Sequence, residues 1–238
     1  MKMNILKTFS RFWENDRGLS LFLIIIVVTV FVLPPVVSVG TAGRLLADIF
    51  FTLLLISGIA SVSERRGAFI TMTGASIIAL ALRWTDTFMA SPLLDVLDYS
   101  ASISTSVLFS VVVLTRVLKN GPVTVHRILG AIVVYLLFGL AWAKAYGLIE
   151  YLSPGAFEGA LAPSGGFSSF TYFSFVTLAT LGYGDITPVH PVARSLASAE
   201  GILGQLYLAI LIARLVSLEL HFRKIANTPH SKQTDEIE

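Results

Sequence analysis

Residues 171–188 read TYFSFVTLATLGYGDITP, and this stretch decides how the rest of the chain is interpreted. An apolar run long enough for a short helix ends at Thr180. Two glycines, Gly182 and Gly184, then flank a single residue, and Asp185 follows. Because glycine adopts left-handed backbone conformations at little steric cost, the motif predicts a backbone that other residues avoid. What such a segment does depends on the sequence around it.

The composition is that of a membrane protein. Of the 238 residues, 55% are hydrophobic and 13% are charged, and the mean hydropathy is +0.79, well above that of ordinary soluble domains. The net charge is only +2 and the basic residues are spread in ones and twos, so no nucleic-acid partner is expected. The chain has no cysteine, which excludes disulfides and thiolate metal sites. We expect an all-α integral membrane protein in contact with membrane lipids.

A transmembrane helix needs about 20 mostly apolar residues. The sequence predicts six such helices, at about 19–39, 44–62, 68–84, 99–118, 125–147 and 192–220. Residues 167–179 are too few to cross the membrane, and glycines and prolines flank them. They are predicted to form a re-entrant helix followed by a loop. Non-helical backbone at membrane depth is tolerated only where protein buries it or where it lines a water-filled path, so a pore is indicated.

Lysines and arginines set the expected orientation. Most of them fall on one side of the predicted helices, together with both termini. Both termini are therefore predicted to be cytoplasmic, and residues 148–191 to face outward, in a multi-pass protein of the plasma (cell inner) membrane. Residues 1–18 are expected to form a cytoplasmic N-terminal segment, which is either an interfacial helix or a disordered tail, and residues 19–118 a four-helix transmembrane domain. Residues 119–220 are expected to form a pore domain, and residues 221–238 a short cytoplasmic tail.

The opening motif suits the binding of a dehydrated cation. Such an ion needs oxygen ligands in place of its water, and backbone carbonyls supply them if the backbone alternates between left- and right-handed conformations. Gly182 and Gly184 fit that requirement. The hydroxyl of Thr180 can add a ligand layer at the inner end, and Asp185 can attract cations at the outer mouth. The carbonyl end of the preceding helix, about 167–179, would favour a cation through its dipole.

The sequence TLATLGYGD strongly resembles the selectivity filter of potassium channels. The resemblance covers about residues 125–220, and the first 120 residues carry no such motif. It implies that K⁺ ions bind in succession to backbone carbonyls, with Gly184 completing the filter and with no cofactor beyond the transported ion. One chain supplies one loop and a filter ring needs four, so a homotetramer is expected. The implied ligands are the carbonyls of Thr180, Leu181, Gly182 and Tyr183 and the Thr180 hydroxyl.

Some residues depart from the pattern of that family. Leu181 stands where Val or Ile is commoner, but only its carbonyl would face the ion. Tyr172 and Phe173 replace a frequent Trp pair and are expected to keep an aromatic cuff around Tyr183. Some relatives carry a glutamate near the end of the pore helix that bonds the mouth aspartate. This chain has valine there, so Asp185 needs another partner.

Glu200 lies inside the final predicted span, where an ionisable group is costly and needs a partner. It is expected to face the pore helix or the fifth span. A hydroxyl of Ser174 or Thr177 would make Glu200 a support behind the filter, in the protonated form if need be. Lys144 would make it an ion pair. The remaining alternative is a solvated glutamate near the outer interface.

The final span also carries a stripe at helical spacing that is assigned to the pore cavity. Gly204 is either a hinge or a small residue that allows close helix packing, and the sequence does not separate the two. The stripe consists of Gly201, Gln205, Leu208, Ile212 and Val216.

A six-helix, one-loop layout resembles voltage-gated channels, in which one helix carries several arginines. The fourth predicted span has only Arg116 and Lys119, both at its cytoplasmic end, so strong voltage gating is not expected.

The leading interpretation is a potassium-selective channel that is not strongly voltage-gated. The alternatives are a weakly selective cation channel, a potassium transporter subunit and a non-conducting subunit. Transporters of that kind usually carry several filter-like loops in one chain, and this chain has one. An enzyme is not expected, because no carboxylate pair or nucleophile with a base is found and the histidines are scattered, at His126, His190, His221 and His230.

Overall fold

The structure is a computed structural model that describes residues 17–37, 40–61, 66–88, 91–119, 123–159 and 167–226. Almost all of the predicted N-terminal segment, and the tail from residue 227, lie outside the described residues. In the described part, the chain forms helices and one pair of short strands. The prediction of an all-α membrane protein is therefore confirmed in its main feature.

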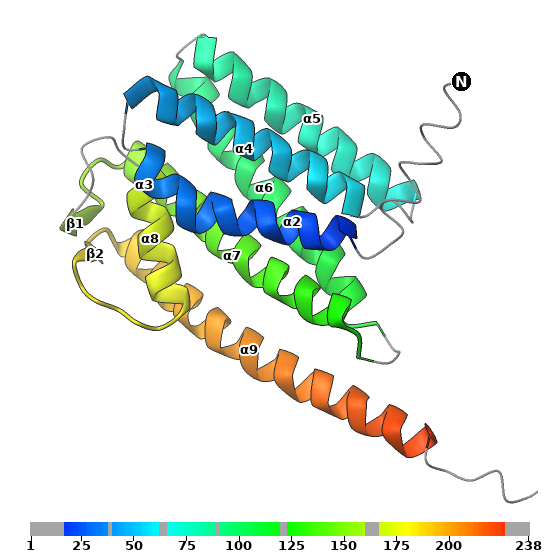
Figure 1. The fold of residues 1–238 in the computed structure, drawn as a ribbon. Helices are drawn as coiled ribbons and strands as arrows, with labels where there is room; N and C mark the ends of the chain where they lie inside the picture. The colour runs from blue at the N-terminus through cyan, green and yellow to red at the C-terminus, as the bar shows by residue number, and fades with distance from the viewer. Residues whose placement is uncertain are drawn as a thin grey trace, which may run out of the picture.

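The first half of the chain folds into helices joined by short connections (Figure 1). A π-helical turn separates α2 from α3 and comes directly before Pro34 and Pro35. Proline cannot donate a backbone hydrogen bond, which favours such a local change in the helix. The elements are α2 (Arg17–Val27), η1 (Val28–Val32), α3 (Leu33–Val37), α4 (Gly40–Ser61), α5 (Arg66–Phe88) and α6 (Pro92–Val117).

The second half contains two long helices with a short one between them. The long α9 runs beside α8, and in Figure 1 its C-terminal half extends past the rest of the bundle. The strands β1 and β2 pair in antiparallel fashion near one end of α8. The elements are α7 (Val125–Leu152), β1 (Phe157–Gly159), α8 (Phe167–Leu178), β2 (Ile186–Pro188) and α9 (Pro191–Ala226).

Five stretches of helix in the described residues are long and apolar enough to cross a membrane, one fewer than the six predicted. The missing one is α4, whose apolar part, Leu45–Ala60, is shorter than a typical span. The span predicted at 44–62 therefore stays a prediction.

The boundaries of the fourth predicted span also differ. We placed it at 99–118, whereas α6 begins seven residues earlier, at Pro92, with Ser91 in an extended conformation as the N-cap. Proline at the first helical position is favourable because its missing N–H has no partner there. Asp95 and Asp98 lie outside the predicted bounds, but Asp95 is in the first turn of α6, where the helix dipole favours a negative charge.

The helices α2, α4, α5 and α6 share one hydrophobic core with α7. Phe22 and Ile26 of α2 meet Leu55 of α4, Met72 of α5 and Phe109 of α6. Val133 and Leu137 of α7 complete this cluster. At the other end of α7, rings from α7, β1 and α8 form a second cluster, with Tyr146, Phe157, Phe170 and Phe173 at its centre. The helix α7 therefore connects the N-terminal helices to the region around α8.

Candidate functional site

The backbone after α8 alternates in handedness. We call residues 180–185 the filter segment, after the resemblance noted above. Thr180, Gly182 and Gly184 have φ values of 58°, 57° and 78°, whereas Leu181 and Tyr183 between them do not have positive φ. Alternating conformations turn successive carbonyls toward the same side, as the glycine spacing predicts. The left-handed conformation of Thr180 was not predicted, since few residues other than glycine adopt it.

Hydrogen bonds fix the start of the filter segment to the end of α8. The Thr180 N–H donates to the Thr177 carbonyl at 2.9 Å, and the Leu181 N–H donates to the Val176 carbonyl at 2.8 Å. Thr177, a predicted filter support, therefore contacts the segment through its backbone. The segment begins from a fixed position at the carbonyl end of a helix, where the helix dipole favours a cation.

The side chains of the filter segment are not covered by their own chain. Leu181 is 57% exposed and Tyr183 is 67% exposed, although both are large and apolar or aromatic. Exposed side chains of this kind on a protein surface commonly mark a contact with another protein or with lipid.

Glu200 is completely buried, at 0% exposure, between α7 and α8. The Ser174 hydroxyl lies 2.5 Å from Oε1, and the Tyr146 hydroxyl donates to Oε2 at 2.5 Å. The Ser174 hydroxyl also lies 2.8 Å from the Gly139 carbonyl. A hydroxyl has one proton, so Ser174 can bond both groups only if it donates to Gly139 and accepts from Glu200. Every hydrogen-bonding group in this arrangement has a partner when Glu200 is protonated, because its own hydroxyl then donates to Ser174.

Of the three partners that the sequence offered for Glu200, the structure shows a hydrogen bond with Ser174. Tyr146 was missed, although it lies on the predicted fifth span, only two residues from Lys144, which we had considered instead. Lys144 lies over the rings of Tyr99 and Phe167, with its Nζ 5.5 Å and 5.7 Å from their centroids. The solvated alternative is excluded by the burial of Glu200.

Tyr172 and Phe173 have different surroundings. Phe173 is buried against the rings of Tyr146 and Phe157, with centroids 5.0 Å and 5.4 Å away. Tyr172 is 40% exposed, and the nearby Asp185 side chain raises the pKa of its hydroxyl. Tyr172 therefore lies near Asp185, which was expected to need a partner. The aromatic cuff around Tyr183 stays a prediction.

Strand β1 contacts the C-terminal end of the filter segment. It pairs Gly159 with Ile186, directly after Asp185. Gly159 has φ 112°, and a Cβ at this position would overlap the Asp185 carbonyl oxygen. The Glu150 carboxylate, at the end of α7, accepts the N–H groups of Gly155 and Phe157 at 2.9 Å and 3.2 Å. The pairing of Gly159 with Ile186 positions Asp185, and no feature of the sequence indicated this pairing.

We expect Gly159→Ala to reduce conduction by displacing the backbone of Asp185, because the added methyl group has no room. Gly155→Ala is the matched control: Gly155 also has positive φ, at 84°, but no atom lies within 4 Å of a Cβ placed there. Both variants bear similar backbone strain. Ion flux per inserted protein should fall only for Gly159→Ala, and an equal effect of both substitutions would contradict this account.

The predicted cavity stripe lies on the exposed part of α9. Gln205, Leu208, Ile212 and Val216 are exposed, and Gly201 is half-buried. Gly204 is buried, and a Cβ there would overlap the Leu178 carbonyl oxygen of α8. Close packing therefore requires glycine at this position, which favours the packing interpretation of Gly204. The assignment of the stripe to a cavity stays a prediction.

Comparison with known proteins identifies this region. Residues 131–219 match the family model described as an ion channel. Over 90 residues the chain is 36% identical to the inward rectifier potassium channel Kirbac3.1 of Paramagnetospirillum magnetotacticum, covering 37% of this chain and 27% of that protein. Over 95 residues it is 34% identical to the two pore potassium channel c of Oryza sativa subsp. japonica, covering 40% of this chain and 21% of that protein.

The chain spans about a quarter of the length of these curated relatives, and no solved structure matches it significantly. The matched region contains most of α7, all of α8, the filter segment and most of α9. Residues 131–219 therefore match the ion channel family model and are distantly homologous to potassium channels.

Proposed function

We propose that the chain is a potassium-selective channel and that the filter segment selects the ion. The observation that carries this proposal is the left-handed backbone at Thr180, Gly182 and Gly184. In such a segment the carbonyls of residues 180–183 replace the hydration shell of K⁺, and the Thr180 hydroxyl adds an inner layer. Asp185, which lies near Tyr172, would attract cations to the outer mouth.

The conducting unit is proposed to be a homotetramer, because a closed ring of carbonyls needs four loops and each chain has one. Two features support this. Leu181 and Tyr183 are exposed in the single chain, and one side of α9 is lined with exposed apolar residues such as Leu208 and Ile212. Four copies around one axis would cover Leu181 and Tyr183, and the exposed apolar residues of α9 would line a pore. Mass measurement of the purified protein in lipid nanodiscs tests the number of chains.

The placement of basic residues supports an orientation with both termini in the cytoplasm of the cell and the filter segment near the outer face. The proposed location is the plasma (cell inner) membrane.

Selectivity separates the proposal from its main alternative, a weakly selective cation channel. Reversal potentials measured in mixed K⁺ and Na⁺ should follow the K⁺ gradient. Reversal near the potential of a nonselective cation pathway would favour the alternative.

We expect open probability to depend only weakly on voltage. Each elementary charge that crosses the field contributes about 2.3 kcal/mol per 100 mV, so steep gating needs several charges on a moving helix. The basic residue in the last turn of α6 is Arg116, with Lys119 just beyond the helix. A steep voltage response that disappears when these two residues are neutralised would show that α6 is a voltage sensor.

A further inference from the structure

An apolar groove lies between α6, α7, α9 and the end of α8. Its volume is about 480 Å³, which is within the range of pockets that bind small molecules between the helices of bundles. Two of its lining residues, Val107 of α6 and Leu206 of α9, are exposed, so the groove is open to the surroundings of the chain. The lining includes Ile103, Val107, Phe138, Trp142, Leu178 and Leu206.

The chemistry of the lining requires an apolar occupant. None of the described residues that line the groove is charged. The Tyr207 hydroxyl in the lining already donates to the Ala131 carbonyl of α7 at 2.7 Å. The indole N–H of Trp142 is the one other polar side-chain group among these lining residues. Cavities with apolar walls stay free of water, so an occupant of the groove must offer an apolar surface.

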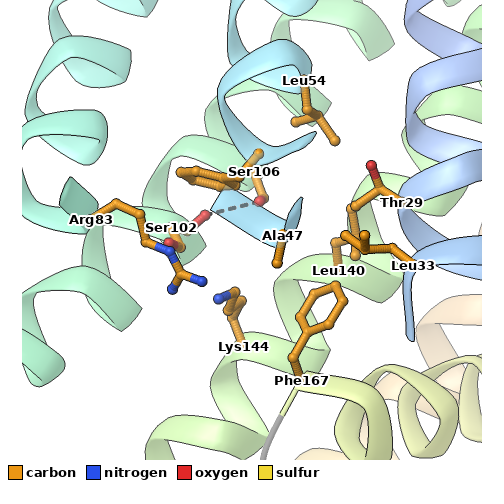
Figure 2. Close-up of a pocket in the computed structure, with 11 residues that line it drawn as sticks. Thr29, Leu33, Ala47, Leu54, Arg83, Ser102, Ser106, Leu140, Lys144 and Phe167 are labelled. Atoms are coloured by element: carbon orange, nitrogen blue, oxygen red, sulfur yellow. Dashed lines mark hydrogen bonds between the residues drawn. The ribbon is translucent and has the colours of Figure 1, made fainter. Parts of the chain in front are cut away.

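A second cavity, among the N-terminal helices and α7, has the opposite character (Figure 2). Its volume is about 40 Å³, and Arg83, Ser102 and Lys144 are among the residues that line it. One water molecule needs about 10–15 Å³ of such volume and several polar partners, so this smaller cavity suits water. The apolar groove offers no comparable set of polar partners.

The groove lies at the middle of the helices that form it. Phe138 is at the centre of the membrane-spanning stretch of α7, and Leu206 is at the centre of that of α9. Ile103 and Val107 flank the centre of the membrane-spanning stretch of α6. The hydrocarbon core of a bilayer is about 30 Å thick, so headgroups and bulk water are about 15 Å from this depth. The acyl chains of lipids are the apolar groups that a bilayer supplies there.

The groove is also on the opposite side of α9 from the predicted cavity stripe. Leu206 and Ile210 line the groove, and each is two residues away from Leu208, a member of the stripe. They therefore lie about 160° around the helix from Leu208. If the stripe faces the axis of the proposed homotetramer, the groove opens away from this axis, toward the bilayer.

An occupant of the groove would contact two residues beside the filter segment. Leu178 is the last residue of α8 and comes two positions before Thr180. Trp142 stacks on Tyr146, with ring centroids 6.2 Å apart, and Tyr146 donates to Glu200. The groove therefore adjoins both the start of the filter segment and the buried glutamate behind it.

We propose that the apolar groove is a binding site for the acyl chain of a membrane lipid. The distal part of one chain enters between α6 and α9 and contacts Leu178 and Trp142. It restores the van der Waals contacts that the lining residues would lack around an empty space. The direction in which the groove opens rests on the proposed homotetramer, whereas its depth and its apolar lining do not.

Trp142 supplies a reporter inside the groove. It is one of three tryptophans in the chain, so Trp13→Phe with Trp84→Phe leaves it as the single tryptophan. The probes are two phosphatidylcholines, one brominated in the distal half of an acyl chain and one brominated close to the headgroup, because bromine quenches tryptophan on contact. In liposomes of the first lipid, Trp142 should lose most of its emission. In liposomes of the second, it should keep most of it.

A variant that fills the groove separates a bound chain from ordinary contact with the bilayer. Ala141 lines the groove, and Ala141→Phe should restore most of the emission in the deeply brominated lipid. Ala81→Phe, the same substitution at an exposed residue of α5, is the matched control and should leave the quenching unchanged. If Ala141→Phe fails to insert, Val107→Phe replaces it.

Two results would overturn the proposal. Emission that neither brominated lipid quenches would show that another part of the protein, such as a neighbouring copy, covers the groove. Equal quenching with and without Ala141→Phe would show that Trp142 meets the bilayer outside the groove. Neither measurement depends on conduction, so a wild-type protein without potassium selectivity would refute the proposed function and still leave this inference decided.

Discussion

Replacement of Gly182 by alanine is expected to abolish potassium flux while the protein still inserts in the membrane. Gly182 has φ 57°, and no atom of its own chain lies within 4 Å of a Cβ placed there. The effect therefore comes from the backbone and not from a collision within the chain. A residue other than glycine costs roughly 1–2 kcal/mol in this conformation. In the proposed ring of four copies the total would be roughly 4–8 kcal/mol, enough to leave the conducting conformation almost unpopulated.

The control for Gly182→Ala is again Gly155→Ala, which introduces the same methyl group at a positive φ outside the filter segment. It should conduct like wild type. If Gly182→Ala conducts with normal selectivity, residues 180–185 are not the filter.

The second large effect is expected at Glu200. Glu200→Val removes the acceptor of the buried Tyr146 hydroxyl and one of the two partners of the buried Ser174 hydroxyl. An unsatisfied buried group costs about 1–3 kcal/mol. Because Ser174 lies on α8 one turn before its end, the loss should destabilise the filter segment. Steady current should fall, without a change in tetramer assembly.

Glu200→Gln is the conservative comparison, since an amide can accept from Tyr146 and donate to Ser174 as the protonated acid does. We expect it to retain most of the current. Tyr146→Phe removes one hydrogen bond only and should have an intermediate effect. Normal steady current in Glu200→Val would show that this group is not a support for the filter.

Sequence reasoning located the filter segment because its signal is local. The positions of Gly182 and Gly184 predict alternating backbone conformations, and the structure contains them. The same reasoning could not predict the left-handed backbone conformation of Thr180, because threonine rarely adopts it. It restricted Glu200 by depth and helical face to the pore helix or the fifth span and offered Ser174, but on the fifth span it considered Lys144 and missed Tyr146. Those two residues differ by about 200° around α7, and only the packing of the helices decides which one faces α9.

Contacts between distant parts of the chain could not be predicted from the sequence. Gly159 reads as an ordinary loop glycine, and its contact with Asp185 exists only because β1 pairs with β2. Asp48 and Arg83 are 35 residues apart, and each alone looks like a charge near the end of a span. No motif marks the first four helices, so the ion pairs of Arg83 with Asp48 and Asp98 appear only once α4, α5 and α6 are packed together.

The measurement that tests the central claim most directly is the flux of K⁺ and of Na⁺ through purified protein in liposomes. The carbonyls of residues 180–183 are proposed to replace the hydration shell of K⁺, so K⁺ flux should exceed Na⁺ flux by at least about tenfold. Gly182→Ala liposomes with the same protein content should show neither flux. Equal K⁺ and Na⁺ flux through wild-type protein, or no flux of either ion, would contradict the assignment of a potassium-selective filter.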